Sequence, residues 1–368
     1  MSRKIAVIGA GISGLLAACF SAQKGFRVTI YEKQDFPPVN PSTIAGGMMA
    51  PYSEIETLPL NFINAGLKSI ELWQSLLKGE CGAFLQKKGS LFIAHPADEA
   101  YLDRFARHLK SVNGGWKWVD AKEISKLEPG LEGRFHKGFY IPEEAHIVPL
   151  QALEFLFKKF LSYGGQMKKC EIEPEDLTQD YDWVIDCRGY APQVDQDLRG
   201  IKGEIILVRN NAFSLKRPVR LMHPRYPLYI VPRPDHIFAV GATAIENAEE
   251  DDGLVTLRSA MELMSACYSL HSGFGEADIL DMSSGIRAAY QDNLPRIIID
   301  GEKRYIRGNG LFRHGYLLSP VMARCIAHYL ETGEENEDFS LFSGRYNYSA
   351  SFDKDRQPEQ TGCRKFTA

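Results

Sequence analysis

The sequence predicts an α/β protein that begins with a nucleotide-binding β-α-β unit and continues into a second, mainly antiparallel sheet. The segment 4–33, KIAVIGAGISGLLAACFSAQKGFRVTIYEK, has the pattern of a strand, a glycine-rich turn, an amphipathic helix and a second strand. Between residues 203 and 286, strand-like runs are separated by prolines and turns, which is typical of antiparallel pairing. A chain of 368 residues can form two domains or one elaborated α/β unit.

The glycine-rich turn has the spacing that binds a dinucleotide. Gly9 suits the tight turn, Gly11 lets the backbone approach a pyrophosphate, and Gly14 allows the helix to pack closely on the strand. The phosphates would lie at the helix N-terminus, where free N–H groups point outward. Glu32 ends the second strand, where a carboxylate accepts the ribose hydroxyls of an adenosine and repels a 2′-phosphate, so NADP is disfavoured. The alternative is a glycine-rich turn in an ordinary α/β domain.

The remaining elements follow from apolar periodicity and from helix-capping signals. Asp120 is a predicted N-cap with Glu123 at capping-box distance, and Gly333 is expected to stop the last helix. A buried strand that ends in Asp186 and leads to Gly189 is expected to return beneath the nucleotide. Helices are predicted at 60–77, 99–112, 120–127, 148–163, 254–268 and 321–330, and strands at 89–93, 183–186, 203–208, 228–231, 238–242 and 279–286.

Composition excludes several classes of protein. The chain is 44% hydrophobic and 24% charged with a formal net charge of −4, which argues against nucleic-acid and membrane-surface proteins. The seven cysteines have no metal-ligand spacing, so we expect reduced thiols in the cytoplasm and no metal site. No apolar run has the length of a signal peptide ahead of the first strand or of a transmembrane helix.

Seven motifs together resemble a known family of flavoproteins. They are GAGISG at 9–14 with Glu32, AGGMMAP at 45–51, DCRG at 186–189, YIVPR at 229–233, VGAT at 240–243, SGIRAAYQDNLPRI at 284–297 and LFRHGYLLSP at 311–320. The set resembles the D-amino-acid-oxidase superfamily, and within it is most similar to the glycine oxidases associated with thiazole synthesis in thiamine biosynthesis. The similarity extends to about Leu330 with the motifs in family order.

The resemblance implies non-covalent FAD and a Rossmann-type FAD-binding domain interleaved with a mainly antiparallel substrate domain. The FAD-binding domain would comprise 1–78, 137–200 and 283–345, the substrate domain 79–136 and 201–282, and a C-terminal tail 346–368. Backbone N–H groups at 315–317 would contact the pyrimidine edge of the flavin. The expected cofactor residues are Gly9, Gly11, Ile12, Ser13, Gly14, Glu32, Lys33, Ala45, Gly46, Gly47, Met48, Gly189, Gly315, Tyr316 and Leu317.

The resemblance also implies three residues that contact the substrate. Arg287 corresponds to an arginine that grips the α-carboxylate, Tyr229 to a tyrosine whose hydroxyl contacts the same group, and Arg313 to a second pocket arginine. A guanidinium fork matches a carboxylate, and a phenol adds a neutral donor. By themselves, Arg287 could be a structural ion-pair partner and Tyr229 a core residue. We do not interpret His314 as a base, because the family chemistry needs none there.

The implied reaction is oxidative deamination of glycine or a related small amine. A hydride would pass from Cα to flavin N5, O2 would be reduced to hydrogen peroxide, and the imine would hydrolyse or pass to a thiazole synthase. A homo-oligomer is expected. Ala244 stands where characterised glycine oxidases have a bulkier residue, which leaves a D-amino-acid or sarcosine-type oxidase or dehydrogenase open.

Two further alternatives follow from other features. The chain could be the flavin module of a tRNA wobble-uridine modifying enzyme, with the basic cluster Lys216, Arg217, Arg220 and Arg225 as its RNA contact, although a solvated basic loop explains that cluster as well. It could also be a non-catalytic flavoprotein in which the dinucleotide is structural.

Overall fold

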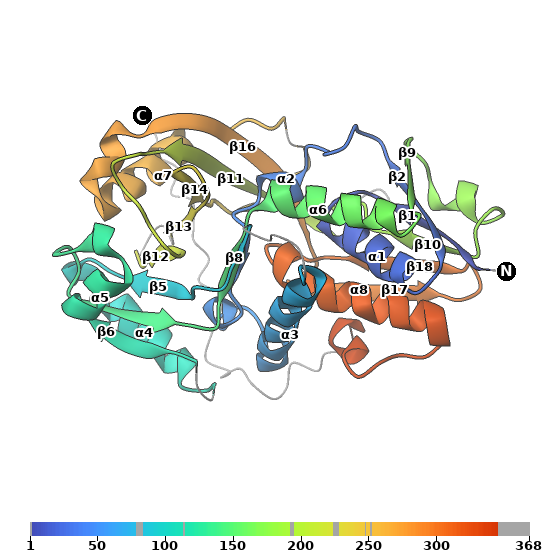
Figure 1. Cartoon of the computed structure of the whole chain (residues 1–368), viewed down its shortest axis with the longest axis horizontal. Coiled ribbons are helices and arrows are strands. Elements are labelled where there is room, and N and C mark those ends of the chain that lie inside the picture. Colours follow the sequence, from blue (N-terminus) through green and yellow to red (C-terminus); the bar gives the residue numbers. More distant parts are fainter. Residues whose placement is uncertain are drawn as a thin grey trace, which may run out of the picture.

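The computed structural model describes residues 2–78, 84–112, 115–191, 195–223, 228–246, 248–250 and 252–344. Within these ranges the strands form a six-stranded, a nine-stranded and a three-stranded sheet, which we call the first, second and third sheets. Figure 1 shows the first sheet and its helices at one end of the molecule and the second sheet at the other. The predicted tail at 346–368 and Arg225 lie outside the described residues, as do Cys81 and Cys363.

The first sheet has the predicted nucleotide-binding topology. Strand β1 lies in its centre, parallel to β2 on one side and to β10 on the other, and β17 is the one antiparallel strand among those described. In spatial order the strands are β17 (Arg296–Asp300), β18 (Tyr305–Asn309), β10 (Trp183–Asp186), β1 (Lys4–Ile8), β2 (Arg27–Glu32) and β9 (Gln166–Lys169). The loops that follow the four central strands therefore meet at one edge, where ligands of such sheets bind.

Two helices pack against α1 (Ile12–Gln23) beside the first sheet: α6 (Pro149–Ser162) and α8 (Gly315–Thr332). The apolar face predicted for α1 is buried, and the small residues Ala17, Ala18 and Ala22 are buried as well. Helix α1 contacts both other helices, so its small side chains allow close approach on more than one face. Helix α3 (Leu60–Leu76) packs on α8.

The second sheet is mainly antiparallel, as predicted. Its longest pair is β11 with β16, and only the β12–β5 pair is parallel among the described strands. The strands are β15 (Ile245–Glu246), β11 (Arg199–Arg209), β14 (Ile237–Gly241), β13 (Leu228–Pro232), β12 (Val219–Leu221), β5 (Ser90–Ile93), β7 (Lys137–Ile141) and β6 (Lys117–Asp120), with β16 (Asp278–Ala289) beside β11. Helices α4 (Glu99–Leu109), α5 (Ala121–Leu127) and α7 (Leu257–Leu270) accompany it.

Sheet membership differs from the predicted segments at three places. Strand β7, placed in the FAD-binding segment 137–200, pairs with β5 and β6 of the second sheet. The first residues of β11 and the last of β16, which were also placed in FAD-binding segments, pair with each other in the same sheet. The third sheet, β3 (Met48–Met49), β8 (Ala145–Ile147) and β4 (Leu85–Gln86), joins segments from both predicted domains. Two of the predicted boundaries therefore fall inside β11 and β16, and the division into two domains stays a prediction.

The helix ends show where local signals were sufficient and where they were not. The predicted capping box of α5 is present, since Asp120 Oδ1 accepts from the Glu123 N–H at 2.9 Å and Glu123 Oε2 from the Asp120 N–H at 3.2 Å. Helix α8 ends at Gly333 as predicted, but it begins at Gly315 instead of residue 321. Pro320 lies inside it and has no N–H for the Tyr316 carbonyl, which accepts the Trp73 indole N–H at 3.0 Å instead.

Candidate active site

A single cavity of about 1530 Å³ contains almost the whole predicted site. Every predicted cofactor and substrate residue except Gly14 lines it, although these residues come from seven separate stretches of chain. Pockets for drug-sized ligands occupy about 300–1,000 Å³, so this cavity has room for a dinucleotide and a small substrate together. Its lining extends from the turn after β1 to Arg287 on β16.

The turn after β1 has a shape that only glycine permits. Gly9 has φ +99°, and a Cβ on it would lie 2.8 Å from the Cys187 carbonyl oxygen. A Cβ on Gly14 would lie 1.9 Å from the Gly9 carbonyl oxygen, which is why Gly14 lies behind the cavity wall instead of in it. The Ile12 N–H donates to Ser42 Oγ at 3.1 Å, so the short helix α2 (Pro41–Ile44) closes over the turn.

Glu32 is fixed in the place predicted for the acidic ribose ligand. Its buried carboxylate accepts the Ala10 N–H at 2.8 Å and the Gln34 N–H at 3.1 Å. Each carboxylate oxygen keeps a further lone pair for a ligand hydroxyl. Lys33 borders the same end of the cavity, but its side chain is largely exposed and its Nζ lies 3.8 Å from Glu171.

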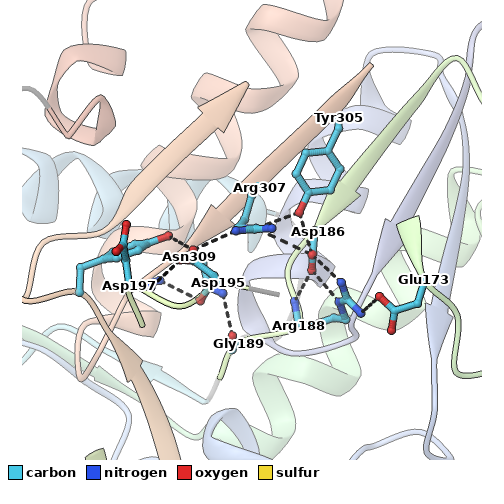
Figure 2. Close-up of polar contacts among 11 residues, drawn as sticks. Glu173, Asp186, Arg188, Gly189, Asp195, Asp197, Tyr305, Arg307 and Asn309 are labelled. Carbon is cyan, nitrogen blue, oxygen red and sulfur yellow. Dashed lines mark hydrogen bonds and ion pairs between the residues drawn. The ribbon is translucent and has the colours of Figure 1, made fainter. Parts of the chain in front are cut away.

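A polar network holds the loop after β10, which forms another wall of the cavity (Figure 2). Asp186 accepts two hydrogen bonds from the Arg188 guanidinium, at 3.1 and 3.0 Å, and one from the Tyr305 hydroxyl at 2.9 Å. Asn309 Nδ2 donates to the Gly189 carbonyl at 2.7 Å. The predicted cofactor residue Gly189 is thereby tied to β18, and the DCRG motif acts through its side chains as well as through its glycine.

The segment 45–48 lies against Tyr229. A Cβ on Gly46 would lie 2.8 Å from the Tyr229 ring, and Gly47 has φ +81° with its hypothetical Cβ 1.9 Å from the Ile147 carbonyl oxygen. Met48 belongs to β3 and is half-buried at the cavity wall. These glycines let the backbone pass between the tyrosine and the third sheet.

The first turn of α8 also faces the cavity. Gly315, Tyr316 and Leu317 line it, and the first N–H groups of a helix have no partner within the helix. The Tyr316 hydroxyl donates to the Ser42 carbonyl at 2.8 Å, which ties the start of α8 to the helix that covers the glycine turn. The N-termini of α2 and α8 therefore border the same cavity.

Arg287 lies flat across the neighbouring strand. A Cβ on Gly203 would lie 2.0 Å from Arg287 Nη2, so the guanidinium occupies the space that the glycine leaves free. Arg287 Nη1 donates to the Thr243 carbonyl at 3.1 Å, and no carboxylate pairs with this guanidinium among the described residues. Burial lowers the pKa of Arg287, yet a guanidinium stays charged at any ordinary pH. The fork is available to an anion in the cavity.

The Tyr229 hydroxyl is a protonated donor in a cationic environment. It packs against Gly46 and Gly241, where a Cβ would lie 3.0 and 2.8 Å from the hydroxyl oxygen. Burial raises the pKa of Tyr229 and outweighs the nearby positive charges, which lower it, so the phenol remains neutral. The charges that act on it are those of Arg287, Arg220, Arg233 and Arg313.

Arg313 lines the cavity as predicted, but its charge is paired. Its Nη2 lies 2.6 Å from Glu54 Oε2, and Arg220 Nη2 lies 3.2 Å from Glu54 Oε1. Burial alone would raise the pKa of Glu54, but Arg313, His314 and Arg220 hold it at about 2. His314 is buried beside them, and burial lowers its pKa to about 4, so the imidazole is neutral at pH 7. Sequence reasoning missed Glu54 because nothing local marks it as a charged cavity residue.

The basic cluster considered as an RNA contact is mostly internal. Arg217 is buried and pairs with Glu128 at 2.7 Å, and Arg220 points to Glu54 in the cavity. Lys216 is exposed, and Arg225 lies outside the described residues. The interpretation as a surface patch is therefore wrong for Arg217 and Arg220. Of the helices in the described ranges, none combines the length and apolar character that a membrane span requires.

Comparisons with known proteins place these features in a family context. The model of the family described as DAO, FAD dependent oxidoreductase, matches residues 4–329. A Rhizobium etli protein, whose assignment as the thiamine biosynthesis oxidoreductase ThiO is itself inferred, is 40% identical over 331 residues, which cover 89% of this chain and 97% of that protein.

Two solved structures have the same fold. Glycine oxidase from Geobacillus kaustophilus has a TM-score of 0.80 at 23% identity, over 94% of this chain and 100% of its own. Iminodiacetate oxidase from Chelativorans sp. BNC1 has a TM-score of 0.77 at 21% identity, over 92% and 98% respectively. At 23% and 21% identity, the similarity to these two structures shows a shared fold alone.

Proposed function

The chain belongs to the DAO family of FAD-dependent oxidoreductases, and from this premise we propose that it oxidises glycine or a related small amine to an imine. FAD is the cofactor of the family, and the cavity fits it. The glycine turn would hold the pyrophosphate, Glu32 the adenosine ribose, and the first turn of α8 the flavin. When bound, FAD would supply a two-electron acceptor for the hydride from Cα, and its reoxidation would reduce O2 to hydrogen peroxide.

Arg287 is the observation that carries the proposal. Its fork has a carbonyl partner on one side, lines the cavity, and has no carboxylate partner among the described residues. A bidentate pair with an α-carboxylate would neutralise it, and Tyr229 would add a neutral donor to the same group. Two contacts to one carboxylate orient Cα, which is how positioning accelerates a reaction between bound groups.

The cationic environment favours the reactive form of the amine. An amino acid arrives as an ammonium and must lose a proton before a C=N bond can form as the Cα–H bond breaks. Around Tyr229, the three positive charges of Arg287, Arg220 and Arg313 outnumber the one negative charge of Glu54. Positive neighbours lower the pKa of an ammonium. The side chains therefore assist deprotonation electrostatically. We infer that the imine then takes up water to give an α-keto acid and ammonia, or passes to a thiazole-forming enzyme.

A substrate larger than glycine is the second candidate. Ala244 lines the cavity at the position where characterised glycine oxidases have a bulkier residue, and a side chain that ends at Cβ leaves more room in the cavity. This feature favours D-alanine, D-proline or sarcosine over the tRNA alternative, which loses its contact surface with the internal positions of Arg217 and Arg220.

The test is anaerobic flavin absorbance with glycine, sarcosine, D-alanine and D-proline added one at a time to the wild type and to Arg287→Ala. Bleaching by one of these amines that the variant loses would support both the reaction and its anchor. Arg209→Ala is the matched control, because Arg209 pairs with Asp278 at the far end of β11 and does not line the cavity. If no small amine bleaches the flavin, the proposal is wrong.

A further inference from the structure

A buried carboxylate stands directly behind the substrate arginine. Glu204 follows Gly203 in β11, is fully buried and does not line the cavity. Its Oε2 accepts the Thr243 hydroxyl at 2.9 Å, and its Oε1 accepts the Thr256 N–H at 2.8 Å. Burying an ionised carboxylate is costly unless its oxygens are hydrogen-bonded, so both oxygens are committed to defined partners.

The hydrogen bonds of Glu204 determine how Thr243 is held. The Glu204 N–H donates to Thr243 Oγ1 at 2.9 Å, while the same hydroxyl donates to the Glu204 carboxylate. The hydroxyl thus accepts from the backbone and donates to the side chain of one residue, which leaves a single orientation for it. The Thr243 N–H also donates to the Glu204 carbonyl, at 3.3 Å.

Thr243 and Gly203 define the position of Arg287 from two sides. The Thr243 carbonyl accepts Arg287 Nη1 at 3.1 Å, and Gly203 provides the flat floor beneath the guanidinium. Glu204 is next in the chain to Gly203, and it forms hydrogen bonds with Thr243. A shift of Glu204 would therefore move both supports of the fork.

Glu204 also anchors the helix that borders the same cavity. Thr256 is the N-cap of α7, with its Oγ1 accepting the Ser259 N–H at 3.2 Å. Ser259 and Glu262 on that helix line the cavity. The carboxylate therefore couples the start of α7 to the residue that holds Arg287.

We propose that Glu204 is a positioning residue, which acts through Thr243 to align Arg287 for a bidentate grip on the substrate carboxylate. The proposal rests on the proposed function. It assigns a role in the reaction to a residue that touches neither substrate nor cofactor. A residue that served only to stabilise the sheet would affect unfolding without affecting the affinity for a carboxylate.

The experiment measures the Kd of acetate, a carboxylate that cannot be oxidised, from the perturbation of flavin absorbance in the holoenzyme. Thr243→Val removes the hydroxyl, and Thr243→Ser keeps it. We expect Thr243→Val and Glu204→Gln to raise the Kd of acetate and the KM of the amine substrate about tenfold, with a smaller change in kcat. Thr243→Ser should stay within about twofold of the wild type, since it restores the hydrogen bonds.

Glu128→Gln is the matched control, because Glu128 is a buried carboxylate that does not line the cavity and pairs with Arg217. It should lower the melting temperature and leave the Kd of acetate unchanged. An unchanged Kd of acetate in folded Thr243→Val and Glu204→Gln would overturn the inference. Loss of FAD or of folding in both variants would also overturn it, because it would show a structural role.

The two proposals fail separately. If the wild type binds acetate and responds to Thr243→Val, but no amine bleaches its flavin, the positioning role stands and the proposed reaction fails. If amines bleach the flavin while Thr243→Val behaves like Thr243→Ser, the reaction stands and the positioning role fails. If the wild type binds no carboxylate, both are wrong.

Discussion

The two ends of the cavity are built in different ways. The cofactor end is formed by the segment 4–33 together with 45–48, Gly189 and 315–317, largely through backbone N–H groups and glycines that leave no space for a side chain. The substrate end is formed by charged side chains from distant segments, with Arg287 on β16, Tyr229 on β13, and Glu54, Arg220 and Arg313 in one ion-pair cluster.

This difference determines how each end responds to a change. Backbone shape depends on steric fit, so a single methyl group can abolish it, whereas a flexible charged side chain can move aside. Charge pairing depends on pH and on solvent, which steric fit does not. The cofactor end should therefore fail abruptly and the substrate end gradually.

The largest effect is expected from Gly14→Ala at the cofactor end. The added Cβ would lie 1.9 Å from the Gly9 carbonyl oxygen, and neither backbone segment can move without opening the turn. We expect FAD affinity to fall by about 100-fold, which corresponds to ~2.7 kcal/mol. The FAD content after dialysis measures it. Gly301→Ala, where nothing lies within 4 Å of the added Cβ, is the control and should keep its FAD.

The ion-pair cluster at the substrate end should make stability depend on pH. The pKa of Glu54 is held at about 2, below its ordinary 4.5, so its stabilisation is complete above pH 4.5 and is lost as the pH falls toward 2. Glu54→Gln should cost roughly 2 kcal/mol at pH 7, because two arginines lose their partner and Arg313 is partly screened by solvent. The cost should shrink below pH 4.5 in denaturant titrations.

Glu144 provides an opposite case for the same titration. It is fully buried, and burial raises its pKa from 4.5 to about 7. Stability from a carboxyl with a raised pKa is present below pH 4.5 and lost as the pH rises through 7, so Glu144→Gln should gain stability relative to the wild type over that range. If both variants showed the same trend, the ion-pair account of the substrate end would be wrong.

Gly203→Ala is the counterpart of Gly14→Ala at the substrate end. Its Cβ would lie 2.0 Å from Arg287 Nη2, but the atom it meets is the end of a flexible side chain that can move away. We therefore expect normal FAD content and a KM raised about tenfold, or ~1.4 kcal/mol. Oxygen-consumption kinetics measure it. Loss of FAD in this variant would break the distinction between the two ends.

The smallest effect is expected from Trp73→Phe, which removes the donor to the Tyr316 carbonyl. The carbonyl remains buried in α8 behind Pro320 without that partner, and one such hydrogen bond contributes about 1 kcal/mol. A fall of this size in the free energy of unfolding, with unchanged KM, would confirm that the contact serves the helix. A change in KM would extend the substrate site to α3.

Local patterns predicted the elements that make most of their own contacts. The strand 183–186, the helix 60–77 and the capping box at Asp120 follow from apolar periodicity or short-range hydrogen bonds. Strands such as β9 and β18 were not predicted, because QMKK and YIRGN have no strand pattern of their own. In the fold, β9 pairs with β2, and β18 pairs with β10 and β17. The start of α8 was predicted too late, because the indole that replaces the missing N–H comes from another helix.

By itself the sequence determined the class of the fold and the glycine turn with its acidic partner, because the packing of Gly14 on Gly9 and the place of Glu32 depend on neighbours within one β-α-β unit. Only the tertiary structure decided the substrate end. There the pairing of Arg313 with Glu54, the floor of Arg287 on Gly203 and the support from Glu204 arise when segments far apart in the chain are brought together. Charges and close contacts act through distance in space, which sequence order does not encode.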